Sequence, residues 1–294
     1  MPKVMRTGIL TESDMKNKRY KVLYIAMFLF MVIYALIALV PVVWVMLSGF
    51  KSVGEMYQIP PTFFPKEIDL SKLWKVWTEL KFYNYYLNTF IMAGGVVLFD
   101  VVVSGLAGYV ISRLKPLGTK VIFAVMFWVM LLPGTMRIVP LYMTFVDFPV
   151  LHISMLDTFW PIWLMAAANV FDIILFKNFF DGLSNSLVES AKIDGATNMR
   201  IFFSIILPLS MPVFIVVGVF AFNGQMGQFL WPMLLISDEK KTVLGVLIYK
   251  MKTFEYTMDY QMLVLLFSVL PQLIIYAIFQ RKIIGGINIG GVKG

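Results

Sequence analysis

The residue types that enzymes use for catalysis are scarce in this sequence. It has no cysteine and one histidine, His152, which excludes thiolate chemistry, disulfides and a metal site built from histidines. No phosphate loop of the form G-x-x-x-x-G-K-[ST] occurs, so the chain does not hydrolyse a nucleotide by that mechanism. No H-E-x-x-H motif, serine–histidine pairing or acidic metal cluster occurs either. The sequence therefore predicts a protein that is not an enzyme and that holds no metal or cofactor of its own.

The charged residues with an informative spacing lie in one polar insert, residues 177–208. It contains Glu189-Ser190-Ala191-Lys192-Ile193-Asp194-Gly195-Ala196 and ends in Ile205-Ile206-Leu207-Pro208. The pattern predicts one short helix over 183–193 and a second over 197–207. Gly195 lies between them, and glycine bends a backbone at the least steric cost. Because the second segment is largely apolar, we expect the insert to pack against a partner. The alternative is an ordinary solvated loop.

The rest of the chain is strongly apolar. Of 294 residues, 60% are hydrophobic and 14% charged, against about 45–50% and 25% in soluble domains. A helix needs about 20 apolar residues to cross a bilayer. Such runs occur at Val22–Phe50, Phe90–Ile111, Val121–Phe145, Phe159–Phe176, Leu209–Trp231 and Tyr260–Gln280. In the second run, small residues such as Gly105 and Gly108 would let another helix approach closely. The sequence predicts an all-α integral membrane protein with about six transmembrane helices.

The distribution of Lys and Arg predicts the orientation of these spans. Basic residues concentrate before the first span, in the 113–120 turn, in the insert and after the last span. The net charge of +8 therefore reports topology rather than a nucleic-acid-binding surface. The N- and C-termini are predicted to be cytoplasmic. Residues 1–21 form the N-terminal segment, residues 22–284 the membrane domain with the cytoplasmic insert, and residues 285–294 a Gly-rich tail.

Polar side chains inside the spans are a second group with functional potential, because they are costly there. The ionisable ones are Asp100, Arg137 and Asp172. They look isolated from one another, and Asp172, like Arg113, is expected near the inner boundary, where water hydrates it. Arg137 could pair with an acid of this chain or of a partner. Asn223, Gln225 and Gln228 form a polar patch in the fifth span that could hydrogen-bond a hydroxyl-rich solute, or could serve helix packing instead.

The insert resembles the E-A-A–x3–G–x9–I–x–L-P loop of bacterial ABC-importer permeases, with Ser190 in place of the second alanine. Further matching residues are Asn88-Thr89, Tyr109, Arg113, Pro140-Leu141-Tyr142, Gln280-Arg281 and the tail ending Gly-Gly-Val-Lys-Gly. Together they resemble the carbohydrate-importer permeases of the maltose MalG type over essentially the whole chain. Met226-Gly227-Gln228-Phe229 departs from the Trp-Asn-acid-Phe that family members often show, so a pathway role does not carry over to this patch.

The resemblance implies the type I ABC-importer permease fold and the transmembrane subunit of an ATP-driven importer of sugars or oligosaccharides. It implies four kinds of partner: a second permease, two ATP-binding subunits that hold ATP and Mg, an extracytoplasmic solute-binding protein, and membrane lipid. The ATPase-coupling loop would comprise Glu189, Ala191, Asp194, Gly195, Ala196, Ile205, Leu207 and Pro208. The tail residues Gly290, Gly291, Val292, Lys293 and Gly294 would also contact the ATPase subunits, or else form a free terminus.

The physical logic of the insert agrees with that role. A membrane subunit without a nucleotide site must receive work from a separate ATPase, and a compact two-helix element can fit a groove on such a partner. Glu189 is placed for charge-assisted contacts, while Asp194 either caps the second helix or pairs across the interface. The alternatives are an ABC importer for a non-sugar solute, a structural scaffold, or an ion-coupled secondary transporter. The last needs paired acids or broken helices at mid-membrane.

Overall fold

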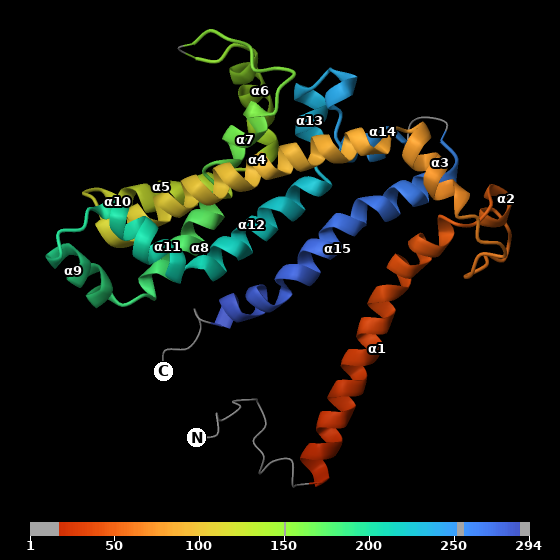
Figure 1. Ribbon diagram of the computed structural model, residues 1–294, viewed down its shortest axis with the longest axis horizontal. Coiled ribbons are helices and arrows are strands. Elements are labelled where there is room, and N and C mark those ends of the chain that lie inside the picture. The colour runs from red at the N-terminus through yellow and green to blue at the C-terminus, as the bar shows by residue number, and fades with distance from the viewer. Residues whose placement is uncertain (1–17, 150, 252–255, 289–294) are drawn as a thin grey trace. The chain divides into compact units, whose positions relative to one another are not determined.

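The computed structural model describes residues 18–149, 151–251 and 256–288, with side chains up to Ile283. Within these ranges helices are the regular secondary structure, and the one β feature is an isolated bridge between Phe148 and Ile153. Helices make up most of the described chain (Figure 1), which agrees with the all-α prediction.

The helices follow one another with short connections. They are α1 (Lys18–Ser48), α2 (Val53–Met56), α3 (Ser71–Glu79), α4 (Phe82–Tyr109), α5 (Thr119–Leu131), α6 (Ile138–Val146), α7 (Trp160–Ala166), α8 (Val170–Asp181), α9 (Asn185–Ile193), α10 (Asn198–Ile201), α11 (Leu207–Leu209), α12 (Met211–Met226), α13 (Leu230–Leu235), α14 (Leu244–Met251) and α15 (Met258–Asn288). One π-helical turn, Val110–Leu114, extends α4, and another, Phe202–Ile206, joins α10 to α11.

Three continuous helices are long and apolar enough to cross a membrane: Lys18–Ser48, Phe82–Leu114 and Met258–Ile283. Three further segments are pairs of helices that meet at a bend, of 99° between α5 and the Gly134–Val146 segment, 44° between α7 and α8, and 79° between Asn198–Leu209 and α12. By length and composition the described chain thus has three crossing helices, or up to six if each bent pair forms one span.

The third predicted span is wrong as a single straight helix. Helix α5 ends at Leu131, and the chain turns sharply before α6 begins at Ile138. The turn lies at Pro133-Gly134. Proline has no backbone N–H to continue a helix and glycine is a poor helix former, so both residues favour a break here.

The fourth and fifth spans also differ from the prediction in their bounds. The fourth is broken before Val170, where the Asn169 side chain caps α8 by accepting a hydrogen bond from the Phe171 N–H at 3.0 Å; it then continues to Asp181. The fifth was predicted to reach Trp231, but α12 ends at Met226, where Gly227 follows. Capping residues and a glycine, rather than hydropathy, set these ends.

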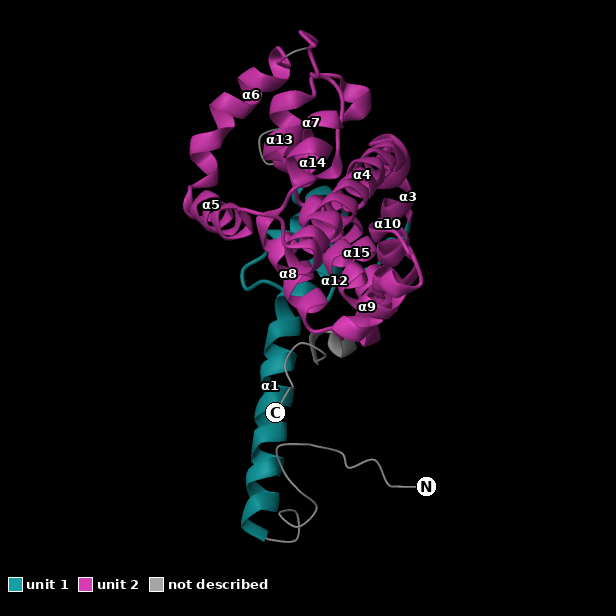
Figure 2. Ribbon diagram, turned by 90° about the vertical axis from the view of Figure 1, so that its left-hand side faces the viewer, with its two compact units in different colours: residues 1–70, 257–263 teal, residues 71–256, 264–294 magenta. Residues whose placement is uncertain are grey.

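The chain divides into two compact units, residues 1–70 with 257–263, and residues 71–256 with 264–294 (Figure 2). In the first unit a buried polar cluster follows α1. The Lys51 ammonium lies 4.1 Å from the centre of the Trp44 ring and donates to the Thr62 carbonyl. The Thr62 hydroxyl donates to Glu55 at 2.7 Å, and this bond lowers the pKa of Glu55 below its ordinary value.

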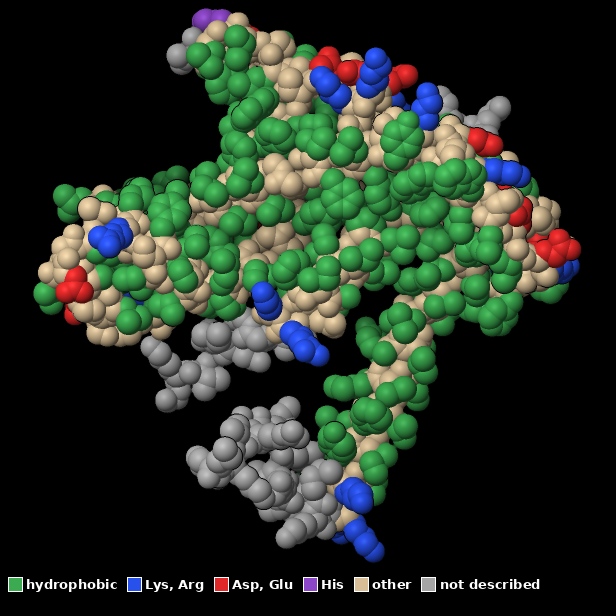
Figure 3. Space-filling model, viewed as in Figure 1, with side chains coloured by type: hydrophobic (Ala, Val, Ile, Leu, Met, Phe, Trp, Pro, Cys, Tyr) green, Lys and Arg blue, Asp and Glu red, His purple; other side chains and the backbone are tan. Residues whose placement is uncertain are grey.

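Helix α1 presents its apolar side chains outward along its length. None of its most apolar window is buried, and Ser48 is the one residue it buries. Hydrophobic side chains cover it, with Lys and Arg gathered at its first turns (Figure 3). An apolar surface of this length is a surface for lipid or for another membrane subunit.

In the second unit α4 is the central helix, and α8 and α12 pack against it. Gly108 permits the contact with α8, because a Cβ at this position would lie 2.6 Å from the Cβ of Phe176. The close helix approach predicted from Gly105 and Gly108 is therefore confirmed. Around this contact a buried cluster extends from the spans to the polar insert, formed by Tyr109, Phe176, Phe180, Val188, Ala191, Ile201, Phe202, Ile206, Val213, Phe214 and Val217.

Candidate functional site

The polar insert folds as two short helices with a sharp bend between them, as the sequence predicts. Helix α9 begins after Ser184, whose hydroxyl accepts a hydrogen bond from the Ser186 N–H at 3.3 Å. It ends in paired bonds from the Gly195 N–H to the Lys192 carbonyl at 3.0 Å and from the Ala196 N–H to the Ala191 carbonyl at 2.9 Å. This is the Schellman arrangement. It requires a left-handed residue, and Gly195 supplies it with a φ of 77°.

The second helix of the insert is capped by Thr197. Its hydroxyl accepts a hydrogen bond from the Arg200 N–H at 3.4 Å. Asp194 instead terminates α9 and is exposed. Of the two roles expected for Asp194, capping the second helix is thus wrong, and pairing across an interface stays a prediction.

The two helices form a knob, residues 184–209, with one buried and one exposed face. The residues predicted to couple divide between the faces: Glu189, Asp194, Gly195 and Pro208 are exposed, Ala191 is buried, and Ala196, Ile205 and Leu207 are partly buried. Five large apolar side chains join the exposed set: Leu187 at 42%, Ile193 at 86%, Met199 at 62%, Phe203 at 57% and Leu209 at 48%. These exposed apolar side chains, which we call the apolar rim of the knob, lie on a segment that also carries exposed charges, and exposed apolar side chains of this size mark a surface for a partner.

Arg113 connects this knob to the end of the second span. Its guanidinium donates to the Asn185 side chain, to the Phe180 carbonyl and, at 2.7 Å, to the Leu183 carbonyl. Arg113 is therefore not simply hydrated at the membrane boundary, as the sequence suggested. The signal in the sequence was the resemblance itself, which included Arg113 without a role.

Two further side chains strengthen the same connection. The Ser112 hydroxyl donates to Asp181 at 2.6 Å, at the end of α8. The Tyr109 hydroxyl donates a longer bond of 3.4 Å to the Asn198 carbonyl, the first residue of α10. The end of the second span thus contacts both helices of the knob.

A polar cavity of about 240 Å³ lies between α4, α8 and α12. Its polar lining comprises Asp100, Asn169, Asp172 and Gln225. Asp100 and Asp172 both line this cavity and are close enough to interact electrostatically, and the Ser104 hydroxyl donates to Asp100 at 2.7 Å. Asp172 lies in the first turn of α8.

The cavity corrects two expectations from the sequence. Asp172 is not a hydrated residue at the end of the fourth span, because it is 6% exposed and begins the second half of a broken span. Nor are the charges isolated, since Asp172 meets Asp100. The sequence did not show this pair because contacts between distant spans are not visible in hydropathy.

The polar patch of the fifth span is divided by the fold. Gln225 lines the cavity, whereas Asn223 and Gln228 do not. The side-chain oxygens of Asn223 and Gln225 are buried and accept no hydrogen bond within the described ranges. Arg137 lies exposed in the turn between α5 and α6. The tail residues Gly290 to Gly294 lie outside the described residues.

At the other end of α4, Asn88 and Thr89 hold the segment 236–251 in place, which we call the outer layer. The Asn88 amide donates to the Lys240 and Thr242 carbonyls at 2.7 and 2.9 Å, and the Thr89 hydroxyl accepts from the Leu244 N–H at 2.9 Å. These bonds attach the start of α14 to α4. They give a structural reason for the Asn-Thr pair that the resemblance included.

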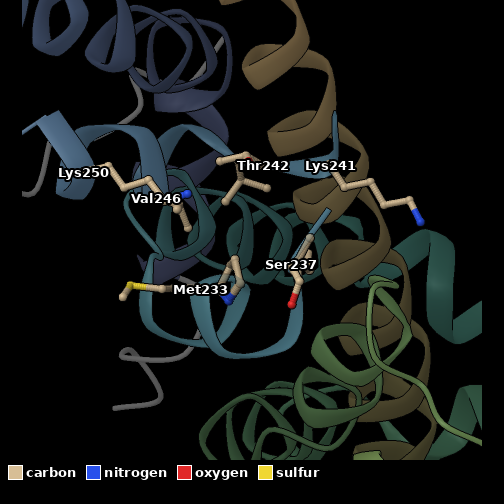
Figure 4. Close-up of a pocket in the computed structure, with 9 residues that line it drawn as sticks. Met233, Ser237, Lys241, Thr242, Val246 and Lys250 are labelled. Atoms are coloured by element: carbon tan, nitrogen blue, oxygen red, sulfur yellow. The ribbon is translucent and has the colours of Figure 1, made fainter. Parts of the chain in front are cut away.

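This outer layer contains one small hollow of about 40 Å³ (Figure 4). Thr242 and Val246 line it, while Lys241 extends away from Met233 and Val246 (Figure 4) and donates to the Asp157 carbonyl at 2.7 Å. Its volume has room for about one water molecule. It is therefore part of the packing of this layer.

Apolar spans, a clamped docking knob on one side and a polar cavity between spans define a multi-pass membrane transport subunit. The chain belongs to the family of binding-protein-dependent transport system inner membrane components, whose model matches residues 100–287. It is thus a multi-pass permease of the inner membrane, and the predicted ABC-importer class is confirmed.

Two curated relatives illustrate the family. The diacetylchitobiose uptake system permease protein NgcG of Streptomyces coelicolor is 30% identical over 88% of this chain and 86% of the relative. The polygalacturonan/rhamnogalacturonan transport system permease protein YtcP of Bacillus subtilis is 26% identical over 95% of this chain and all of the relative, 100%.

A solved structure shows the same fold. A chain of a bacterial ABC transporter involved in the import of the acidic polysaccharide alginate superposes with a TM-score of 0.76 at 24% identity, over 94% of this chain and 99% of that chain. The type I importer permease fold predicted from the sequence is therefore confirmed.

Proposed function

We propose that this chain is the permease subunit of an ATP-driven importer of sugars or oligosaccharides. Two observations support the solute class: the relatives NgcG and YtcP are permeases for saccharides, and the polar cavity offers carboxyl and amide groups that can hydrogen-bond hydroxyls. In this role the chain is not catalytic. ATP and Mg are bound by two partner ATP-binding subunits, and a second permease and an extracytoplasmic solute-binding protein complete the importer.

The knob is the element that docks on a partner ATPase, and the single observation that carries this step is its connection through Arg113. A docking element transmits force only if it is stiff and firmly attached. The knob is capped at both helices and clamped to the second span by three hydrogen bonds from one guanidinium. Its exposed Glu189 and Asp194 and the apolar rim form the contact surface. The tail residues Gly290 to Gly294 are proposed as a second contact with the ATPases.

Closure of the ATPase pair would move the knob, and Arg113 would transfer that movement to the second span. The second span carries Asp100, whose carboxyl meets Asp172 in the polar cavity. A shift of α4 relative to α8 would open or close this cavity. Gln225, Asp100 and Asp172 are therefore the groups of this chain that we place on the translocation pathway.

Cross-linking tests the docking step directly, because the chain has no cysteine of its own. Glu189→Cys in the complete importer is expected to form cross-links to the ATP-binding subunit. Lys240→Cys, exposed in the layer that Asn88 holds at the opposite end of α4, is the matched control and should form none. Cross-links from the control alone, or from neither position, would show that the knob does not dock there.

Uptake measurements test the energy source and the solute class. In proteoliposomes containing the complete importer, uptake of a labelled oligosaccharide is expected to require ATP and to survive ionophores that collapse ion gradients. The acid pair beside a broken span is a feature of ion-coupled transporters, so loss of uptake with the ionophore would favour that class. If the importer took up only a non-sugar solute, and did so in an ATP-dependent way, the permease role would stand and the proposed saccharide specificity would be wrong.

A further inference from the structure

A third, larger hollow lies where the turn between the second and third spans meets α8. Its volume is about 650 Å³. The lining residues are Ile111, the turn 115–120 and Phe123, together with Lys177 and Asp181 of α8. Arg113, inside the same turn, bonds to the start of α9. The hollow therefore lies on the same membrane face as the knob, at the inner ends of three helices.

The hollow has an excess of positive charge. Lys177 is neutralised, because its ammonium lies 2.8 Å from Asp181 Oδ2, and the other oxygen of Asp181 accepts the Ser112 hydroxyl at 2.6 Å. Lys115 and Lys120 also line the hollow, both are exposed, and neither makes an ion pair within the described chain. Lys115 also acts electrostatically on the Asp181 carboxylate, but three lysines against one carboxylate line the hollow, so positive charge remains for an anion.

The side chains at the rim of the hollow are apolar and strongly exposed, although the turn that carries them is polar. Leu117, between Pro116 and Gly118, is fully exposed at 103%, and Val121 is 66% exposed. The turn is held by hydrogen bonds from the Thr119 hydroxyl to the Pro116 carbonyl at 2.6 Å and from the Val121 N–H to the Gly118 carbonyl at 2.9 Å. Leu117 is therefore presented outward by a fixed backbone.

The helix that leaves this turn continues the apolar surface. Helix α5 buries none of its residues, and Val121, Val125 and Trp128 are exposed at 66%, 54% and 73%. Its N-terminus, which favours anions, begins at Thr119 between the two lysines. Positive charge at the membrane boundary, followed by an apolar helix surface, is complementary to a lipid with an anionic headgroup and apolar acyl chains.

We propose that this hollow binds an anionic glycerophospholipid of the leaflet on the knob side. Its phosphate lies between Lys115 and Lys120 at the start of α5, and an acyl chain follows the exposed surface of α5 past Val121. Leu117 contacts the interfacial part of the same lipid. Free phosphate would satisfy the lysines but leaves this apolar surface uncovered, which is why a lipid is favoured over a soluble anion.

Native mass spectrometry of the full chain with its partner subunits tests this proposal. Purified in a zwitterionic detergent with equal phosphatidylglycerol and phosphatidylcholine, the wild type is expected to retain phosphatidylglycerol preferentially. Lys115→Gln combined with Lys120→Gln should reduce that preference at least about tenfold, since each lysine near a surface contributes roughly 1 kcal/mol. The double change Lys75→Gln with Lys240→Gln, at exposed lysines outside the hollow, should leave it unchanged.

A second variant separates lipid binding from simple anion binding. Leu117→Ser keeps both charges and lies at a fully exposed position, so it should fold normally and yet retain less phosphatidylglycerol. Competition by inorganic phosphate at millimolar concentration should leave the lipid bound. Equal retention by the wild type and the Lys115/Lys120 variant, or complete displacement by phosphate together with no effect of Leu117→Ser, would overturn the proposal.

Discussion

Arg113, in the last turn of the second span, donates a hydrogen bond to the side-chain oxygen of Asn185, the first residue of α9. The same guanidinium also donates to the carbonyls of Phe180 and Leu183. One side chain therefore joins the end of α8, the connection after it and the start of the knob. The knob is therefore attached to the second span through this guanidinium.

Replacing Arg113 should uncouple the importer. Arg113→Lys keeps the charge but loses the planar fork that reaches several acceptors at once, and each lost bond to a charged group costs about 1.5–3 kcal/mol. A free-energy loss of about 1.4 kcal/mol corresponds to a tenfold change. We therefore expect uptake to fall at least about tenfold, while membrane insertion is retained. ATP hydrolysis by the complete importer and uptake of labelled saccharide are measured together. Lys240→Gln, exposed at the opposite end of α4, is the control; equal loss in both variants would contradict a specific role for Arg113.

Gly195 should tolerate asparagine better than valine. Its φ is 77° and a Cβ would meet nothing within 4 Å, so the cost of a side chain is backbone strain rather than a clash. A β-branched residue in this conformation costs about 1–2 kcal/mol, whereas asparagine adopts it more readily. We expect Gly195→Val to lower uptake about 5- to 30-fold and Gly195→Asn to lower it less. Identical uptake by the two variants, measured at equal membrane levels, would show that the bend is not required.

Local patterns in the sequence were sufficient for the knob and for most of the spans. The bend at Gly195 could be predicted because it depends only on residues nearby in the sequence. The 20-residue apolar runs identify spans by length alone. The bends inside the third and fourth spans were not predicted. Pro133-Gly134 and Asn169 act within an apolar run, and hydropathy averages over them.

Contacts between spans were beyond the reach of these patterns. The pairing of Asp100 with Asp172 depends on how α4 packs on α8, which a single sequence does not specify. The same holds for the bonds from Asn88 to the carbonyls of Lys240 and Thr242. In both cases the sequence identified the polar residue as notable. Its partner, however, lies about 70 residues away or more along the chain, and tertiary packing brings the two together.

Gly108 and Gly94 lie on the same helix and should respond differently to valine. A Cβ at Gly108 would lie 2.6 Å from the Phe176 Cβ and 3.1 Å from the Ile173 carbonyl, whereas one at Gly94 meets nothing within 4 Å. Overpacking of a helix contact costs about 1–3 kcal/mol. Gly108→Val is therefore expected to lower the thermal unfolding temperature of the purified protein, and Gly94→Val to leave it unchanged. A reduction of similar size in both variants would show that valine lowers the unfolding temperature through its poor helix propensity rather than through the α4–α8 contact.

The outer layer should lose stability in acid through Asp157. Its carboxylate accepts hydrogen bonds from the Ser237 N–H at 2.6 Å and the Asp238 N–H at 3.0 Å. The bond from Asp238, with that from Ser237, holds the pKa of Asp157 below its ordinary value of 3.8. Because the folded-state pKa is the lower one, the carboxylate stabilises the fold above the unfolded pKa. That contribution is lost as the pH falls through the folded-state value.

Asp157→Asn isolates this contribution. Residue 157 has a φ of 57°, which asparagine tolerates. Both N–H groups donate to the same oxygen, Oδ1, and the amide oxygen of asparagine can take its place, so the variant removes charge with little change of shape. At pH 7 its thermal unfolding temperature should be lower than that of the wild type. On acidification below about pH 4 the wild type should lose this advantage, and the two unfolding temperatures should converge. A difference that persists at the lowest pH would mean that the carboxylate acts through its shape, since a charge effect must vanish once the group is protonated.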